Sequence, residues 1–375
     1  MAPINTPELR ERAAQVLVAS ADRVRQMSAF VGLDGFVDEI VHAVNTRKNA
    51  TEYTRLETIS DFGDRIKEAA GRSTNIEMVR QKMKLGGNGP IMANALATLG
   101  LKVTYVGALG YPKIASVFTS FTERADVHSI SESGHADAAE FLDGKVMLVK
   151  SDPLNDVTWA NIQDRYGRDR FQAAFSQSTL VSFVNWTMIP FMSDIWDSLL
   201  AEFCPLLRGP RRRIFFDLAD PQKRSVEDIQ RALKLIGRFQ EFFDVTLGLN
   251  EKEASEIAEV LGLKFDERTP DGLATMGQEI YARLNIDSVV IHPVPYAFAI
   301  QKNEVAMVSG PRVTKPLITT GAGDHFNSGF CLGQSLGLDN AACVLIGVAT
   351  SGYYVKNAQT PTLSDLASFL RNWPS

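Results

Sequence analysis

Apolar residues form short buried-strand runs that alternate with longer helix-like segments through the second half of the chain. Strand patterns fall at residues 180–184, 213–217, 243–249 and 288–292. Helical spacing is found at residues 191–203, 225–240, 251–262 and 271–284. Strands that alternate with helices favour a parallel sheet that is covered by helices on both faces. The pattern therefore predicts an α/β fold with a doubly wound, mostly parallel sheet flanked by helices.

The N-terminal part of the chain begins with a predicted helix. Thr6 followed by Pro7 is typical of a helix start, and helical spacing continues almost to residue 28. The next residues, 28–33, are an apolar run that predicts a buried strand. We therefore expect residues 1–28 to form a helical extension and residues 29–375 to form one α/β domain.

Composition and charge argue against several classes of function. The chain carries a net charge of −5, which argues against a general nucleic-acid or membrane-surface binder. It has no uncharged apolar run of the ~18 residues that a membrane span needs, and its charged first 28 residues do not resemble a signal peptide. The three cysteines have no metal-binding spacing, and their odd number does not suit a disulfide framework. We expect a cytoplasmic protein without nucleic-acid or membrane partners.

One stretch, residues 319–330, carries the strongest chemical signal. Two threonines precede the tripeptide Gly321-Ala322-Gly323, Asp324 follows at once, and a helix-compatible apolar run comes next. Small residues allow close approach of a ligand, and a helix that starts there would aim unpaired N–H groups at an anion. An acid in the first turn could accept a proton from a hydroxyl beside a bound phosphate. The alternative is a tight loop in which Asp324 only caps the helix.

Other polar residues follow predicted strands. Asp34 comes directly after the strand at residues 28–33, and Asn185 and Asp217 also lie at strand ends, where ligands bind in open α/β sheets. Asn250 and Glu253 open a helix after another strand. Their spacing fits a capping box, and Glu253 could also act on magnesium through bound waters. Both interpretations can hold together.

Two motifs resemble those of the ribokinase-like, PfkB-type carbohydrate kinases. Thr-Gly-Ala-Gly-Asp-x-Phe-x-x-Gly-Phe, starting at Thr320, resembles the C-terminal signature of that family. Gly86-Gly87 and the following helix, which ends in Leu99-Gly100, resemble its Gly-Gly substrate loop. The motifs lie in the family's order. The resemblance implies a ribokinase-like fold and transfer of the γ-phosphoryl group of ATP to a hydroxyl of a sugar or sugar-like molecule.

The resemblance also implies roles for individual residues. Asp324 would be the general base, with an anion hole made by the amides of Gly321, Ala322 and Gly323. The sugar would contact Asp34, Gly86, Gly87 and Asn88. ATP would contact Asn250, Thr320 and Asn357, and Glu253 would serve Mg²⁺.

Alternating segments at residues 36–59, 74–84 and 125–150 suggest additional strands. In the resembled family the first of these regions contributes to a small β lid over the sugar, and we expect the same here. A lid excludes water from a reactive phosphoryl donor. It would also offer a surface for a homodimer.

Some positions depart from the family pattern. Ile91 stands where the family usually has an asparagine, Ile318 replaces an acid, and the loop at His292 and Pro293 replaces a glycine-containing turn. His325 is expected to point away from Asp324. These departures keep open a non-catalytic sugar- or nucleotide-binding protein on a kinase fold. Because the resembled superfamily also includes nucleoside kinases, a nucleoside kinase is a second alternative. The identity of the acceptor is not readable from the sequence.

Overall fold

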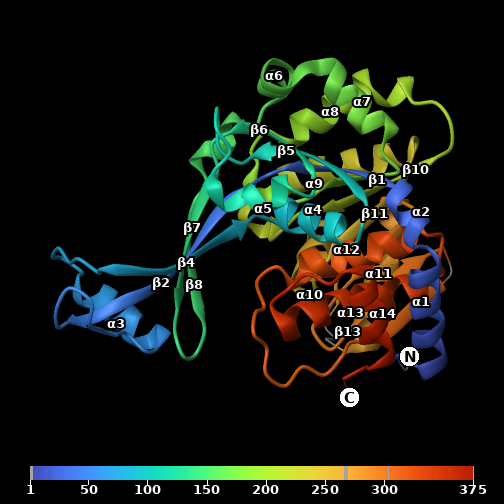
Figure 1. The fold of residues 1–375 in the computed structure, drawn as a ribbon. Coiled ribbons are helices and arrows are strands. Elements are labelled where there is room, and N and C mark those ends of the chain that lie inside the picture. The colour runs from blue at the N-terminus through green and yellow to red at the C-terminus, as the bar shows by residue number, and fades with distance from the viewer. Residues whose placement is uncertain (1–2, 266–268, 303, 375) are drawn as a thin grey trace.

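Nine strands form one continuous, mostly parallel sheet in the computed structural model of the protein (Figure 1). The structure describes residues 3–265, 269–302 and 304–374. From edge to edge the strands are β14 (Glu304–Ser309), β13 (Tyr296–Gln301), β12 (Ser288–Ile291), β11 (Phe243–Leu249), β10 (Arg212–Asp217), β9 (Leu180–Phe183), β1 (Ser28–Leu33), β5 (Lys102–Ala108) and β6 (Asp126–Ser131). The β12–β13 and β13–β14 pairs are antiparallel, and the other pairs are parallel. The predicted doubly wound sheet is confirmed.

Helices cover both faces of this large sheet. One face carries α7 (Arg168–Gln177), α8 (Met192–Glu202), α9 (Val226–Phe239), α10 (Glu251–Val260) and α11 (Pro270–Leu284). The opposite face carries α1 (Pro7–Ala19), α2 (Ala21–Gln26), α4 (Asn88–Thr98), α12 (Ala322–Ser335), α13 (Asn340–Asn357) and α14 (Leu363–Arg371). Two short helices, α5 (Thr119–Thr122) and α6 (Trp159–Ile162), lie in the connections.

The central strands are apolar throughout because both of their faces are buried. In β1, Phe30 packs into the core under α7 to α11, and its neighbour Val31 packs into the core under α4 and α12. Side chains that alternate between two cores explain the unbroken apolar run at residues 28–33. Because β1, β9, β10 and β11 are parallel neighbours, their carboxyl ends lie along one edge of the sheet.

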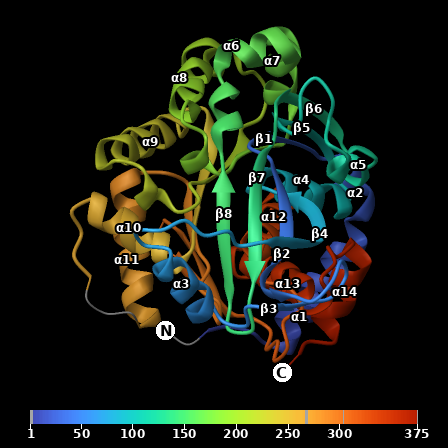
Figure 2. The ribbon, with the colours of Figure 1, turned by 90° about the vertical axis from the view of Figure 1, so that its left-hand side faces the viewer.

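A second sheet of five strands extends from this body (Figures 1 and 2). Its strands are β2 (Phe36–Arg47), β3 (Tyr53–Arg55), β4 (Met78–Gly86), β7 (Gly134–Glu140) and β8 (Lys145–Lys150), with α3 (Ile59–Glu68) beside them. This small sheet uses the three regions in which we expected a lid, with one correction. Residues 126–131 form β6 of the large sheet instead, because they pair in parallel with β5.

The N-terminal helical segment belongs to the main body. The expected single helix is divided at Ser20 into α1 and α2. Leu9 and Leu17 of α1 are buried in the same core as Leu366 of α14. Glu11 of α1 also forms an ion pair with Arg371 of α14 at 3.0 Å.

Among the described residues, no helix is both long enough and apolar enough to cross a membrane.

Candidate active site

A cavity of about 400 Å³ lies between the carboxyl edge of the large sheet and the small sheet. We call it the polar cavity. Both sheets contribute to its lining, as do α4, α10 and the start of α12. Of the residues expected in the site, it brings together Gly87, Asn88, Asn250, Glu253, Thr320, Gly321, Gly323 and Asp324.

The loop before α12 has the geometry of an anion site. Gly321 is the N-cap of α12 with φ +90°, a conformation that strongly favours glycine. A Cβ at this position would also lie 3.3 Å from Ile91. The N–H of Ala322 already donates to the carbonyl of Thr319 at 3.1 Å. The Ala322 amide, which we expected to take part in an anion hole, therefore already donates a hydrogen bond within the loop.

Asp324 lies in the first turn of α12 and is almost completely buried. Its Oδ1 accepts a hydrogen bond from the side-chain amide of Asn88 at 3.0 Å. Burial raises the pKa of Asp324 well above its usual range, and the negative charge of Asp217 raises this pKa further. The two motifs recognised in the sequence therefore meet here, through a hydrogen bond between residues 236 positions apart.

Two more buried carboxylates face the same cavity. Asp217, at the end of β10, accepts from the Asn327 side chain at 2.8 Å, and burial raises its pKa to about 6. Glu253 accepts from the backbone N–H of Asp220 at 2.9 Å and of Asn250 at 2.8 Å. Burial, followed by the charge of Asp217, raises the pKa of Glu253 to about 8. The predicted capping box between Asn250 and Glu253 is confirmed.

Asp34 lies behind the cavity wall instead of facing it. Its carboxylate accepts from the backbone N–H groups of Asn88 at 2.9 Å and Gly89 at 2.8 Å, and from the Asn185 amide at 2.6 Å. Burial raises its pKa to about 6. The sugar contact expected of Asp34 does not fit this position, because the side chain is enclosed and caps the start of α4.

Asp38 faces the polar cavity in its place. It lies on β2, and burial raises its pKa although Lys84 is 3.9 Å away. A Cβ on Gly86 would lie only 2.2 Å from Asp38, so glycine at this position makes room for the carboxylate. Gly86 itself does not line the cavity, whereas Gly87 does. Alternation along β2 places Asp38 and its two neighbours on opposite faces of the small sheet. The sequence alone does not show which face points into the cavity.

A second cavity of about 430 Å³ adjoins the first. We call it the apolar cavity. It is lined mainly by apolar residues, including Val294, Pro311, Val313, Val348, Gly352 and Val355, and it shares Asn250, His292 and Gly323 with the polar cavity. Asn357, expected near ATP, lines neither cavity, and its amide donates to the Tyr353 carbonyl at 2.9 Å.

Two buried histidines support the loop and the boundary between the cavities. His325 stacks on Tyr354 with ring centroids 3.6 Å apart, and burial lowers its pKa to about 4. Its Nδ1 lies 2.7 Å from the Gly321 carbonyl, which can only accept, so Nδ1–H donates. His292, whose pKa burial also lowers to about 4, packs on Phe326 where the two cavities meet. No pattern in the sequence indicates the supporting role of His325.

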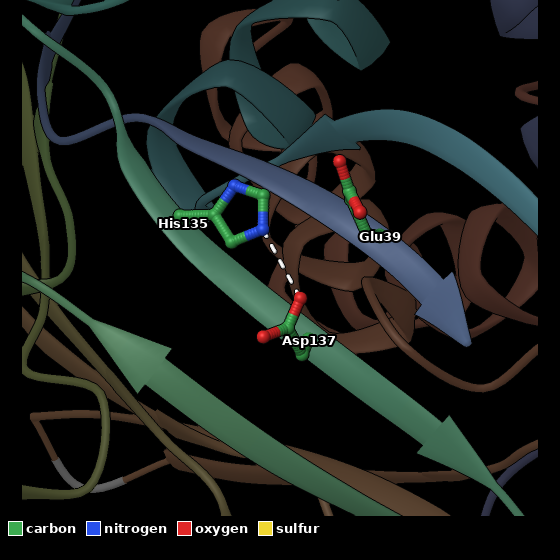
Figure 3. Close-up of side chains that lie close together, drawn as sticks. All are labelled: Glu39, His135 and Asp137. Atoms are coloured by element: carbon green, nitrogen blue, oxygen red, sulfur yellow. Dashed lines mark hydrogen bonds and ion pairs between the residues drawn. The ribbon is translucent and has the colours of Figure 1, made fainter. Parts of the chain in front are cut away.

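The described part of the chain contains one group of three side chains with metal-ligand spacing, and it lies outside both cavities. Glu39, His135 and Asp137 bring their ligand atoms within 4.8 Å of one another (Figure 3). They project from β2 and β7 on the face opposite Asp38. Glu39 pairs with Arg80 at 3.4 Å, and Asp137 pairs with Lys150 at 3.4 Å. These ion pairs already balance the charge of the group.

Comparisons with known proteins agree with this geometry. Solved structures with the same fold include ribokinase from Thermotoga maritima, with a TM-score of 0.63 at 17% identity over 92% of this chain and 99% of that chain. Ribokinase from Arabidopsis thaliana, in a complex with ribose and ATP, has a TM-score of 0.64 at 14% identity over 92% of this chain and 98% of that chain. These similarities confirm the ribokinase-like fold.

Sequence comparison identifies the family. A ketohexokinase from Haloferax volcanii is 27% identical over 350 residues, which is 93% of this chain and 92% of the relative. The sequence profile of the prokaryotic ketohexokinases matches residues 8–373, so all of α1 except Pro7 lies inside the shared region. The family relation argues against a non-catalytic binding protein. The chain therefore belongs to the prokaryotic ketohexokinase family and is a sugar kinase, a phosphotransferase with an alcohol group as acceptor.

Proposed function

We propose that this protein transfers the γ-phosphoryl group of ATP to a hydroxyl of a ketohexose. The observation that carries the proposal is the contact between Asn88 and Asp324 beside the Gly321 loop, within one cavity. This contact combines a buried carboxylate, an amide that orients it and the N-terminus of a helix. The ketohexose is proposed because the curated relative is a ketohexokinase.

In the proposed reaction, Asp324 acts as the general base. The acceptor hydroxyl gives its proton to the Asp324 carboxylate as its oxygen forms a bond to the γ-phosphorus. The bond between that phosphorus and the β–γ bridging oxygen breaks, and ADP leaves with the electron pair. A pKa raised by burial makes Asp324 a stronger proton acceptor than an exposed aspartate. Asn88 holds the accepting carboxylate in place.

Charge on the moving phosphoryl group would be stabilised at the start of α12. Because the Ala322 amide is committed to Thr319, we assign the anion-binding role to the amides of Gly321 and Gly323. The positive end of the α12 dipole lies behind them. Preorganised donors of this kind need no reorganisation during the reaction.

We assign the sugar contact to Asp38, together with Gly87 and Asn88. A carboxylate can accept hydrogen bonds from two hydroxyls, which suits a polyol. Asp34 becomes a positioning residue, because its carboxylate holds the backbone of Asn88 and Gly89 in place. This assignment gives Asp38 the sugar contact that the resemblance implied for Asp34.

We assign the apolar cavity to the adenine base, with Asn250 and Thr320 near the phosphates. The valines that line this cavity suit the faces of an aromatic base. Mg²⁺ also fits, because Asp217 and Glu253 are buried oxygen donors whose mutual repulsion a cation would relieve. These two residues would hold the ion through its bound waters. The ion would supply charge neutralisation at the ATP phosphates.

The decisive test is an ADP-release assay with magnesium across ketohexoses, aldoses, sugar acids and nucleosides. We expect ketohexoses to be phosphorylated fastest. The Asp324→Asn variant should lose roughly 10²–10⁴-fold in kcat while its far-UV circular dichroism and melting temperature stay close to those of the wild type. Turnover of nucleosides alone would favour the nucleoside-kinase alternative. Near-normal turnover by Asp324→Asn would remove the proposed base.

We also propose that the small sheet mediates a homodimer. Met83 of β4 and Leu148 of β8 are exposed on this sheet, at 41% and 43%. Contact between two such sheets would cover them. Light scattering should then give about twice the 41.3 kDa mass of one chain, and Leu148→Glu should give the mass of one chain.

A further inference from the structure

The small sheet brings a lysine to the proposed phosphate site. Lys145, Met147 and Val149 alternate along β8 and share one face of it. Met147 and Val149 line the polar cavity, so Lys145 lies on the cavity side. Its ammonium group donates to the hydroxyl of Thr320, the residue immediately before Gly321. Tyr354 donates to the carbonyl of the same threonine at 3.0 Å, which fixes the backbone that Lys145 reaches.

The charges around the polar cavity make this lysine unusual. The cavity is lined by five carboxylates, namely Asp38, Asp217, Asp220, Glu253 and Asp324, and a triphosphate would bring further negative charge. Two other lysines nearby have carboxylate partners. Lys223 lies 2.9 Å from Asp220, and Lys84 lies 3.9 Å from Asp38.

Lys145 instead donates to a neutral hydroxyl beside the anion loop, although its charge also acts on the Asp38 carboxylate. A hydrogen bond between an ammonium and a hydroxyl is weaker than one between an ammonium and a phosphoryl oxygen, in which both partners are charged. The side chain is half-buried, so part of its hydration has already been lost. Its charge would therefore act more strongly on a phosphoryl oxygen than the charge of a fully exposed lysine.

We propose that Lys145 is a catalytic residue that the small sheet supplies to the phosphoryl-transfer step. Its ammonium group exchanges the Thr320 hydroxyl for a non-bridging oxygen of the phosphoryl group in transfer. It neutralises charge there together with the Gly321 and Gly323 amides. The inference rests on the proposed function, because it requires a phosphoryl group at this loop.

The role predicts a specific kinetic signature. An interaction made mainly in the transition state lowers kcat when it is removed and leaves KM nearly unchanged. We expect Lys145→Met to lose about 10²–10³-fold in kcat. Lys145→Arg, which keeps the positive charge, should recover part of this loss.

The matched control is Lys150→Met on the same strand. Lys150 pairs with His135 across the β7–β8 ladder, on the face away from the cavity, and forms an ion pair with Asp137 at 3.4 Å. Its removal should leave kcat unchanged. A loss in Lys150→Met equal to that in Lys145→Met would assign the effect to the sheet as a whole and overturn the proposal.

Calorimetry provides a readout that does not depend on turnover. ADP with aluminium fluoride mimics the phosphoryl group in transfer, and it would be titrated in the presence of the ketohexose that the wild type phosphorylates fastest. Lys145→Met should weaken binding of this analogue by about the same factor as kcat. The affinity of Lys145→Met for a non-hydrolysable ATP analogue should differ little from that of the wild type. Equal weakening for both ligands would show a ground-state contact and contradict the proposal.

Uncoupled hydrolysis of ATP would indicate that Lys145 instead holds the small sheet closed over the cavity. In that case Lys145→Met would release ADP without forming sugar phosphate, because water would reach the phosphoryl group. Such uncoupled hydrolysis, or an unchanged kcat, would overturn the proposed catalytic role. Failure of the wild type to phosphorylate any ketohexose would instead refute the proposed substrate class. The assay therefore separates the two proposals.

Discussion

The two walls of the polar cavity hold their charged groups in different ways. On the wall of the large sheet, Asp217, Glu253 and Asp324 are buried and accept hydrogen bonds from backbone N–H groups or asparagine amides. On the wall of the small sheet, Lys84 and Lys145 reach inward from strands whose other face is exposed to solvent. The large-sheet wall is mainly acidic and enclosed, and the small-sheet wall carries two cations beside the buried Asp38.

The difference shows how the demands of phosphoryl transfer can be divided within one chain. A proton acceptor benefits from burial, which raises its pKa. Cations that bind a highly charged donor keep their charge more easily where water still reaches them. We therefore expect changes on the large-sheet wall to alter proton transfer and stability. Changes on the small-sheet wall should alter recognition of the sugar and of the phosphoryl group.

The sharpest test of this division is Asp38→Asn, on the small-sheet wall. Loss of a charged acceptor for two sugar hydroxyls should reduce kcat/KM for the ketohexose by roughly 10²-fold, mostly through KM for the sugar. KM for ATP should change little. Glu39→Gln is the control, because adjacent residues of a strand point to opposite faces and Glu39 does not line the polar cavity. Equal effects in both variants would show that the faces of β2 are not functionally distinct.

Glu253→Gln tests how burial of a carboxylate on the large-sheet wall affects the stability of the protein. Because folding raises the pKa of Glu253 from 4.5 to about 8, the folded protein retains a proton that the unfolded chain releases. This contribution to stability is fully present below pH 4.5 and is lost as the pH rises through about 8. In magnesium-free buffer, the melting temperature of Glu253→Gln should therefore gain on that of the wild type from pH 5 to 9. The change should correspond to a few kcal/mol.

The control for this pH series is Glu259→Gln, at an exposed position of the same helix. Its melting temperature should differ from that of the wild type by the same amount at every pH. A pH-independent difference for Glu253→Gln as well would contradict a raised pKa at Glu253.

Asp34→Asn tests whether that carboxylate is structural. Three donors point at it, and an amide can accept from fewer of them. We expect a loss of about 1–3 kcal/mol in the free energy of unfolding at pH 8, measured by urea denaturation. KM for the sugar should stay closer to the wild-type value than in Asp38→Asn. A normal stability combined with a large rise in KM would return the sugar contact to Asp34.

The smallest expected effect is a shift in the pH profile of Asp217→Asn, measured at saturating Mg²⁺ because Asp217 is also proposed to hold the ion. Burial is the main reason for the raised pKa of Asp324, and the negative charge of Asp217 adds to it. Removing that charge should lower the pKa of Asp324, so the base would ionise at a lower pH. The acidic limb of the pH profile of kcat/KM should move down by about one pH unit or less. Movement in the opposite direction would contradict the proposed interaction of the two carboxylates.

Much of the fold and part of the site could be predicted from the sequence. The central strands have apolar runs because both faces are buried, and the helices between them show clear periodicity. Gly321, Asp324 and the Asn250–Glu253 pair could be located because their local geometry demands particular residue types. It is harder to predict from the sequence whether Asp34 or Asp38 faces the cavity, since both follow the same apolar strand. Which of them reaches the cavity depends on how β2 pairs with β4 and β7.

The three-dimensional arrangement of distant segments also explains the other differences between the predictions and the structure. Residues 126–131 join the large sheet because β5 offers them a free edge, and their own alternation does not distinguish one sheet from the other. Asn357 lies at the end of α13 and outside the apolar cavity, whereas Val355 of the same helix lines that cavity. Lys145 reaches Thr320 only because the β7–β8 hairpin crosses to the α12 loop, a contact between residues 175 positions apart.

The pairing of α1 with α14 has a consequence for biosynthesis. Glu11 and Arg371 are 360 positions apart, and the buried face of α1 needs Leu366 and its neighbours as cover. At ~5–20 residues per second, a ribosome takes roughly 20–70 s to add the chain between them. During that time the first helix lacks α14 as a packing partner. Nascent chains of this protein should therefore be clients of ribosome-associated chaperones until translation reaches the last helix.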